Sequence, residues 1–359
     1  MSVTFGKRKV GGDAPCFITF EAGPTHEGLE SAKRLVTLAA EAGGDAVKFQ
    51  ILDPDRLVAD RTLPFEYEVL ADREAGRTEK VTEPLYDILA RRAMSDAEWR
   101  DLKAHADASG VAFFATVGFP DEVDLLEDLK CDSIKIASAD VNHLPLIRRA
   151  AKTGMCLQLD TGNSSIGEIE EAVDVIRAQG NENIIIHHCP SGYPARLESI
   201  NLNVIPTLKR MFAYPIAYSD HTPGWEMDVA ALALGADLIE KSITEDRTMR
   251  SVEHIFSLEP QDMADFIRTI RDVETAMGTS RRVLHEEEKK KRLAARRSIC
   301  AMRPLEAGHI IEQDDLDYRR PGFGIAPDEA DWIIGRPLTR NIDAGEAFRW
   351  DDLGGKTEE

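Results

Sequence analysis

The chain alternates between short apolar runs and amphipathic segments, and this rhythm constrains its fold more than any other feature. Apolar runs of about four or five residues predict buried strands, and the longer segments between them predict helices packed on those strands. We expect strands at residues 17–20, 46–49, 112–115, 133–136, 155–159, 184–187, 216–218 and 238–241. We expect helices to begin near Leu29, Asp96, Asp121, Leu144, Ile166, Ile200 and Glu226, with a last helix over 261–277.

Eight strands, each followed by a helix, predict a (β/α)8 TIM barrel of the α/β class. In such barrels the active site lies at the carboxyl ends of the strands. An open doubly wound sheet is the alternative. The chain has no GxGxxG turn after a strand, which makes that alternative less favourable.

Three of the predicted strands end close to a lysine. These are Lys48, Lys135 and Lys241. An ammonium group at the end of a buried strand is costly to desolvate unless an anion meets it. The pattern therefore predicts one basic pocket, built from several strand ends, and an enzyme with an anionic substrate.

The regular rhythm is broken in two places. Residues 52–94 contain several prolines and many charges and are too long for a plain loop, so we expect an insertion over the barrel mouth.

The second break follows the last predicted helix. With 359 residues the chain exceeds the size of a single core, which is usually about 250 to 300 residues. We expect a barrel domain over 1–280, a charged linker over 281–297 and a compact, turn-rich domain over 298–359.

Charge and cysteine content limit the possible partners and compartment. A formal net charge of −20 argues against binding to nucleic acid or to a membrane surface, because both are polyanionic. The first residues lack the apolar stretch of a signal peptide, so a cytoplasmic protein is expected. The five cysteines form no CxxC pair, which fits reduced thiols.

Seven segments, in order and across both predicted domains, resemble the sialic acid synthase family. They include Glu-Ala-Gly-Pro-Thr-His-Glu-Gly at 21–28, Gly-Asp-Ala-Val-Lys-Phe-Gln at 44–50 and Lys-Ile-Ala-Ser-Ala-Asp at 135–140. The others lie at 188–194, 218–222, 257–260 and 319–322. The resemblance implies a synthase barrel followed by a small antifreeze-like (SAF, β-clip-like) domain, which carries the Arg-Arg-Pro-Gly signature.

The resemblance also implies a reaction and a set of site residues. The family joins phosphoenolpyruvate to an N-acylated amino sugar, and Glu21, Lys48, Lys135 and His221 match catalytic positions. The implied contacts to phosphoenolpyruvate are Lys48, Thr116, Lys135, Ser138, Asp160, Ser191 and Ser219. The implied sugar contacts are Asp140, Tyr193 and Arg320. In the family the small domain reaches across a dimer, so a domain-swapped homodimer is implied.

The metal site departs from the family pattern. Family members bind one divalent metal through two histidines; His221 matches the first, but Ser242 stands in place of the second. A serine hydroxyl is a poor ligand for manganese or zinc. We therefore expect either a weakly bound, magnesium-like and largely hydrated metal, or a replacement ligand. Glu253 is the first candidate because it matches an acidic position near the metal, and His254 and His188 are the others.

Asp160 is a second departure, because the family usually has serine there, facing phosphoenolpyruvate. A poorly solvated carboxylate would repel the phosphate by several kcal/mol. Asp160 could pair with Lys135 or Arg250, bind a metal directly, or mark a changed donor.

The sequence thus predicts a phosphoenolpyruvate-dependent synthase that makes a nonulosonic acid and phosphate from an open-chain N-acylhexosamine such as N-acetylmannosamine. Two alternatives stay open. One is an enzyme of the same fold with a changed donor or reaction, and the other is a sugar-binding paralogue without activity.

Overall fold

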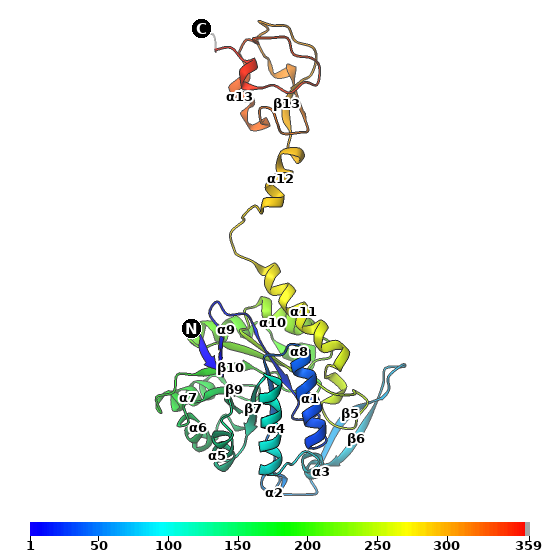
Figure 1. The fold of residues 1–359 in the computed structure, drawn as a ribbon, viewed down its shortest axis with the longest axis vertical. Helices are drawn as coiled ribbons and strands as arrows, with labels where there is room; N and C mark the ends of the chain where they lie inside the picture. Colours follow the sequence, from blue (N-terminus) through cyan, green and yellow to red (C-terminus); the bar gives the residue numbers. More distant parts are fainter. Residues whose placement is uncertain (356–359) are drawn as a thin grey trace. The chain divides into compact units, whose positions relative to one another are not determined.

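The computed structural model describes residues 1–355 and divides the chain into two compact units. The first unit runs from Met1 to Gly278, and the second begins at Thr279. The first unit is a closed barrel of eight parallel strands with helices around it (Figure 1). The prediction of a (β/α)8 barrel is therefore confirmed.

The barrel strands follow one another in chain order, and the last pairs with the first to close the sheet. They are β3 (Phe17–Glu21), β4 (Ala46–Gln50), β7 (Ala112–Val117), β8 (Ser133–Ile136), β9 (Cys156–Asp160), β10 (Ile184–His188), β11 (Ile216–Asp220) and β12 (Leu238–Ser242). Each segment that the sequence predicts as a barrel strand overlaps one of these strands.

Helices connect the strands and pack their apolar faces on the outside of the barrel. They are α1 (Leu29–Glu41), α4 (Asp96–Ser109), α5 (Pro120–Asp128), α6 (Leu144–Ala151), α7 (Ile166–Arg177), α8 (Leu197–Ile200), α9 (Val204–Met211), α10 (Glu226–Ala233) and α11 (Pro260–Met277). The helix predicted to begin near Ile200 begins instead at Val204. Asn201, with a φ of 50°, adopts the left-handed conformation that ends α8.

An amino-terminal hairpin, β1 (Val3–Phe5) and β2 (Arg8–Val10), packs on the opposite end of the barrel from the strand carboxyl ends. Phe5 lies against Phe17 and Phe114, with ring centroids 4.6 and 5.1 Å apart. These three rings and the first inward-facing residues of the other barrel strands form an apolar layer at this end of the barrel. Polar side chains are therefore left to gather at the other end. The sequence did not predict this hairpin, because strands of three residues carry almost no periodic signal.

The insertion expected over 52–94 is folded. It contains α2 (Pro54–Leu57), the antiparallel strands β5 (Pro64–Asp72) and β6 (Arg77–Pro84), and α3 (Leu85–Ala90). Strand β5 contacts the short 3-10 helix η2 (His254–Phe256), which lies in the loop after β12. Arg73, at the tip of the hairpin, donates hydrogen bonds to Glu259. The insertion therefore lies at the carboxyl end of the barrel.

The second unit has its own small apolar core. Its antiparallel pair is β13 (Ser298–Ala301) and β14 (Leu316–Arg319). Its helical segments are α12 (Glu286–Ala295), η3 (Gln313–Asp315), η4 (Pro327–Glu329), α13 (Ala330–Ile333) and η5 (Trp350–Asp352). The backbone after Arg320 is tied down, because Ser298 Oγ donates to the Pro321 carbonyl at 2.7 Å and Gly322 N donates to the Leu293 carbonyl at 2.7 Å.

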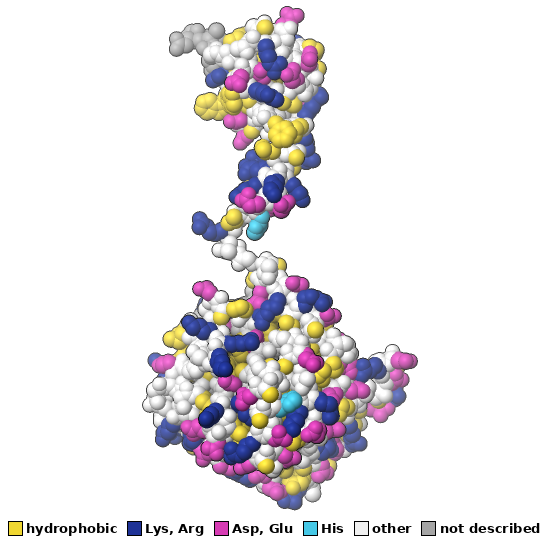
Figure 2. Space-filling view, viewed as in Figure 1, with side chains coloured by type: hydrophobic (Ala, Val, Ile, Leu, Met, Phe, Trp, Pro, Cys, Tyr) yellow, Lys and Arg dark blue, Asp and Glu magenta, His cyan; other side chains and the backbone are white. Residues whose placement is uncertain are grey.

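The surface is charged on both units. On the face shown in Figure 2, acidic and basic side chains of the described residues are interspersed rather than gathered into one basic patch. Within residues 1–355, every helix is too short or too polar to cross a lipid bilayer.

Candidate active site

Two of the three strand-end lysines lie together inside the barrel. Lys48 on β4 and Lys135 on β8 are buried, and both donate hydrogen bonds to the carboxylate of Glu240 on β12. The Nζ atom of Lys48 lies 2.8 Å from Oε1, and that of Lys135 lies 2.6 Å from each oxygen. Two ammonium groups thus converge at the carboxyl end of the barrel, which is the arrangement needed to bind an anion.

Lys241 does not join them, so the expectation of one pocket built from three lysines is wrong. Side chains alternate between the two faces of a strand. On β12, Glu240 points into the barrel and Lys241 points outward, where it pairs with Asp220 and, at 3.3 Å, with Asp228 on α10. Its ammonium also donates to the Thr222 carbonyl at 2.7 Å. This fully buried cluster joins α10 to the barrel and has a structural role.

Glu240 is one residue of the site that the sequence did not predict. Its carboxylate accepts hydrogen bonds from both inner lysines and, at 3.1 Å, from Ser219 Oγ. Burial alone would raise the pKa of Glu240, but Lys135 and Lys48 bring that pKa well below its usual range. A signal was present: an acidic residue inside an apolar strand, on the same face as Ser242 two positions later.

Glu21 flanks the lysines on the other side. It is the last residue of β3, directly opposite Lys48 in the parallel pair, and the two side chains form an ion pair. Its Oε1 atom accepts a hydrogen bond from Gly23 N at 2.6 Å. A Cβ at Gly23 would lie 2.8 Å from the backbone nitrogen of Gln50, so only glycine lets the chain pass this close to β4.

Asp160, at the end of β9, lies beside the same lysine pair. Its Oδ1 atom is 3.1 Å from Lys135 Nζ and 3.7 Å from His187 Nδ1. Of the alternatives for Asp160, pairing with Lys135 is thus the one observed, whereas Arg250 lies 3.7 Å from Glu83. Burial raises the pKa of Asp160.

His187 is neutral, because burial and the neighbouring Lys135 bring its pKa well below the usual value. Its Nε2 atom is hydrogen-bonded to Gln158 Oε1 at 2.8 Å. The histidine thus adds no positive charge beside Asp160.

The predicted hydroxyl contacts continue the same surface. Ser219 is buried and bonded to Glu240, as above. Thr116 on β7 lies in register with Lys135 on β8. Both side chains therefore belong to the barrel interior at the level of the lysines.

Asn163, which the sequence did not predict as a site residue, links the remaining two hydroxyls. Its Nδ2 atom donates to Ser138 Oγ at 3.2 Å, and its Oδ1 atom accepts from Ser191 Oγ at 3.0 Å. Ser138 follows β8 and Ser191 follows β10, so Asn163 after β9 holds three neighbouring loops together.

Replacing Asn163 by alanine is expected to weaken phosphate binding about tenfold, because two hydrogen bonds of on the order of 1 kcal/mol each no longer orient Ser138 and Ser191. Asn163 is exposed, so the free energy of unfolding should change by less than about 0.5 kcal/mol. Titration calorimetry with inorganic phosphate measures the first effect and thermal unfolding the second. Ser164→Ala is the neighbouring control, and equal phosphate affinity in both variants would contradict the role of Asn163.

Two of the three residues predicted to contact a sugar, Tyr193 and Asp140, lie in loops that follow barrel strands. Tyr193 is 46% exposed, and its ring packs on the His221 ring, with centroids 4.7 Å apart. Asp140 ends the 3-10 helix η1 (Ser138–Asp140), and partial burial raises its pKa. Arg320 belongs to the second unit and is exposed there. Its contact with a sugar stays a prediction.

The position predicted for a metal has one imidazole. His221 Nδ1 donates to the Pro190 carbonyl at 3.1 Å, which leaves Nε2 able to bind a cation. Ser242 Oγ donates to Glu253 Oε2 at 2.9 Å. Among residues 1–355, no group of three or more His, Cys, Asp or Glu side chains is arranged to hold a metal. His221 and Glu253 therefore fit at most an open, largely hydrated site.

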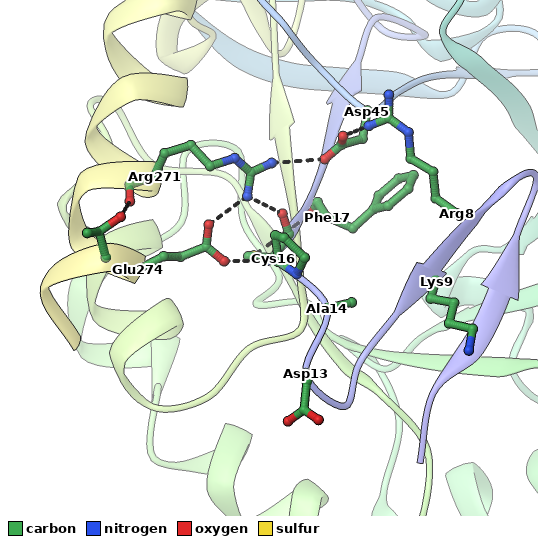
Figure 3. A pocket seen from close by; sticks show the side chains of 11 residues that line it. Arg8, Lys9, Asp13, Ala14, Cys16, Phe17, Asp45, Arg271 and Glu274 are labelled. Carbon is green, nitrogen blue, oxygen red and sulfur yellow. Dashed lines mark hydrogen bonds and ion pairs between the residues drawn. The ribbon is translucent and has the colours of Figure 1, made fainter. Parts of the chain in front are cut away.

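A separate cavity of about 790 Å³ lies at the amino-terminal end of the barrel. Figure 3 shows that its charged side chains mostly bind one another. Arg271 donates to the Cys16 carbonyl at 2.6 Å, to Glu274 at 2.7 Å and to Asp45 at 3.1 Å. These bonds join α11 to the start of β3, so the cavity is a structural junction far from the lysine pair.

A family model described as the NeuB family matches residues 35–282, and one described as the SAF domain matches residues 296–354. The second match confirms the prediction of a carboxyl-terminal SAF domain.

Similar proteins match over nearly the whole chain. A protein of Methanocaldococcus jannaschii described as uncharacterised is 35% identical, covering 98% of this chain and 99% of the relative. An N,N'-diacetyllegionaminic acid synthase of Legionella pneumophila is 34% identical, covering 96% and 98%. The crystal structure of an N-acetylneuraminic acid (sialic acid) synthetase from Leptospira borgpetersenii, in complex with citrate, has a TM-score of 0.70 and 29% identity, covering 81% of this chain and 95% of that one.

Proposed function

Because this chain belongs to the NeuB family, we propose that it condenses phosphoenolpyruvate with an open-chain N-acylhexosamine to give a nonulosonic acid and phosphate. The observation that carries the proposal is the convergence of Lys48 and Lys135 on one point inside the barrel mouth. The named relatives are synthases of acids of this class, which supports the same general reaction.

The lysine pair supplies the binding of the donor. In the free protein the carboxylates of Glu240 and Glu21 form ion pairs with the lysine ammonium groups and hold them in place. Phosphoenolpyruvate brings a phosphate and a carboxylate, and charge-assisted bonds from Lys48 and Lys135 are the strong interactions available for it. Ser219, with the hydroxyls that Asn163 orients, supplies further donors toward the same ligand.

The chemical step joins C3 of the enol to the aldehyde carbon of the sugar. The aldehyde oxygen takes up a proton, water adds at C2, and the C2–O bond to phosphate is finally lost. In this proposal Asp140 and Tyr193 orient the sugar, and Glu21 positions it or moves the proton. Glu21 suits that role because it touches Lys48 and stands in register with Ser242 on the other side.

A divalent metal, when bound, would polarise the aldehyde oxygen and so make its carbon more electrophilic. His221 and Glu253 are the residues that would hold it. With a single imidazole and Ser242 bonded to Glu253, manganese or magnesium should bind weakly. The same proposal includes a domain-swapped homodimer and a contact between Arg320 and the sugar. Light scattering of the purified protein tests the dimer by measuring its molecular mass.

The direct test is incubation of the purified protein with phosphoenolpyruvate, manganese or magnesium, and a panel of N-acylhexosamines that includes N-acetylmannosamine. Phosphate release that depends on the sugar, with a nonulosonic acid detected by mass spectrometry, supports the proposal. Absence of phosphate release with every sugar of the panel contradicts it.

A changed donor is the second candidate function, and Asp160 beside Lys135 is the observation that favours it. A carboxylate in the anion site disfavours a phosphate-bearing ligand if it stays ionised. This candidate predicts that phosphoenolpyruvate binds only at millimolar concentration at every pH, which calorimetry distinguishes from the first proposal.

A further inference from the structure

The anion site holds more acidic than basic groups. Lys48 and Lys135 face three carboxylates, those of Glu21, Asp160 and Glu240, and the nearby His187 is neutral. With both lysines and all three carboxylates ionised, the empty site carries a net negative charge. A ligand with a phosphate and a carboxylate adds still more, and all these groups are buried, where like charges repel strongly. Binding is therefore favoured when one of these carboxylates gives up its charge.

Two of the three carboxylates are well stabilised as anions. Glu240 accepts hydrogen bonds from two lysines and from Ser219. Glu21 pairs with Lys48 and accepts a backbone N–H bond from Gly23. Protonating Glu240 would break several charge-assisted hydrogen bonds at once, and protonating Glu21 would remove the charge that pairs with Lys48.

Asp160 is the least stabilised of the three. It is buried, and within residues 1–355 no donor reaches its Oδ1 atom in hydrogen-bonding geometry, although Lys135 lies 3.1 Å away. Burial and the charge of Glu240 raise the pKa of Asp160, while Lys135 and Lys48 oppose that rise. The groups that face it, on the elements around it, are Lys48, Lys135, His187, Cys189, Tyr193 and Glu240.

We propose that Asp160 takes up a proton when the phosphate-bearing donor binds, so that the neutral acid donates a hydrogen bond to the ligand and the ionised form excludes it. This inference rests on the proposed function and adds a pH dependence to it. The proton comes from solvent, and no bond of the ligand changes. Donor affinity should then fall about tenfold for each pH unit above the pKa of Asp160 in the free protein.

Titration calorimetry of the full chain with phosphoenolpyruvate between pH 7 and 9.5, in buffers of different ionisation enthalpy, counts the protons taken up. Wild type should reach uptake of about one proton per donor at the alkaline end. Asp160→Asn cannot ionise, so it should show no uptake, and at the alkaline end it should bind more tightly than wild type by the factor that wild-type affinity has lost there. Asp160→Ser is a second variant with the same expectation. Asp228→Asn, which alters a buried acid beside Lys241 outside the site, should keep the wild-type uptake.

Two results would overturn the inference alone: phosphoenolpyruvate binding to wild type without proton uptake, or uptake that persists in both Asp160 variants. Either leaves the proposed function standing. Absence of phosphoenolpyruvate binding to wild type over the whole pH range would instead overturn both.

Discussion

Replacing Lys135 by methionine is expected to lower the affinity for phosphoenolpyruvate at least about 100-fold and to abolish detectable turnover, because charge-assisted hydrogen bonds are worth about 1.5–3 kcal/mol each. The variant also leaves Glu240 and Asp160 without the cation that both contact. Breaking a buried ion pair by removing one partner costs about 3–5 kcal/mol. Calorimetry measures the loss of binding, and chemical denaturation measures the loss of stability.

Lys241→Met is the matched control for this variant. Lys241 is as buried as Lys135 and also lies between two carboxylates, but on the outer face of the barrel. Its removal should destabilise the protein by a similar amount, about 3–5 kcal/mol, and leave donor affinity near the wild-type value. Equal loss of donor binding in both variants would mean that instability, not a missing ligand contact, explains the result for Lys135.

The contrast between these two lysines shows what the sequence could predict and what it could not. Apolar runs interrupted by helix-like segments were sufficient for the barrel, because burial of both strand faces leaves a strong signal. The direction of a single side chain depends on the strand's register against its neighbours, and a shift of one residue reverses it. The strand pattern alone therefore did not separate Lys241 from Lys48 and Lys135, whereas the family resemblance implied a ligand contact only for the latter two.

Polar residues that act through other residues were harder to predict. Glu240 and Asn163 make their contacts with side chains more than 20 positions away, from neighbouring strands and loops. Their roles follow from the closed barrel, which brings those strand ends together. Conversely, Ser242 and Asp160 stood out because they interrupt a family pattern, and the structure supplies a partner for each.

Replacing Ser242 by histidine is expected to tighten manganese binding by about 10- to 100-fold or more. Loss of a residue that only hydrogen-bonds to a metal ligand already changes metal affinity by about that range, and a direct ligand should matter at least as much. Asp220 and Lys241 are paired in register on β11 and β12, so the next residues, His221 and Ser242, leave neighbouring strands side by side. A second imidazole would therefore be introduced next to the first. The Nε2 atom of His221 and the new imidazole could then bind the metal together as a two-histidine site.

Manganese titration followed by electron paramagnetic resonance measures this gain without any assay of turnover. Ser242→Ala removes the hydroxyl that donates to Glu253 but adds no ligand, and it should leave manganese affinity within a few-fold of wild type. Adding His221→Ala to the histidine variant should abolish the gain, because the two imidazoles act together. A gain that survives in the double variant would show that the new histidine binds manganese without His221. That result would contradict the prediction that His221 is a metal ligand.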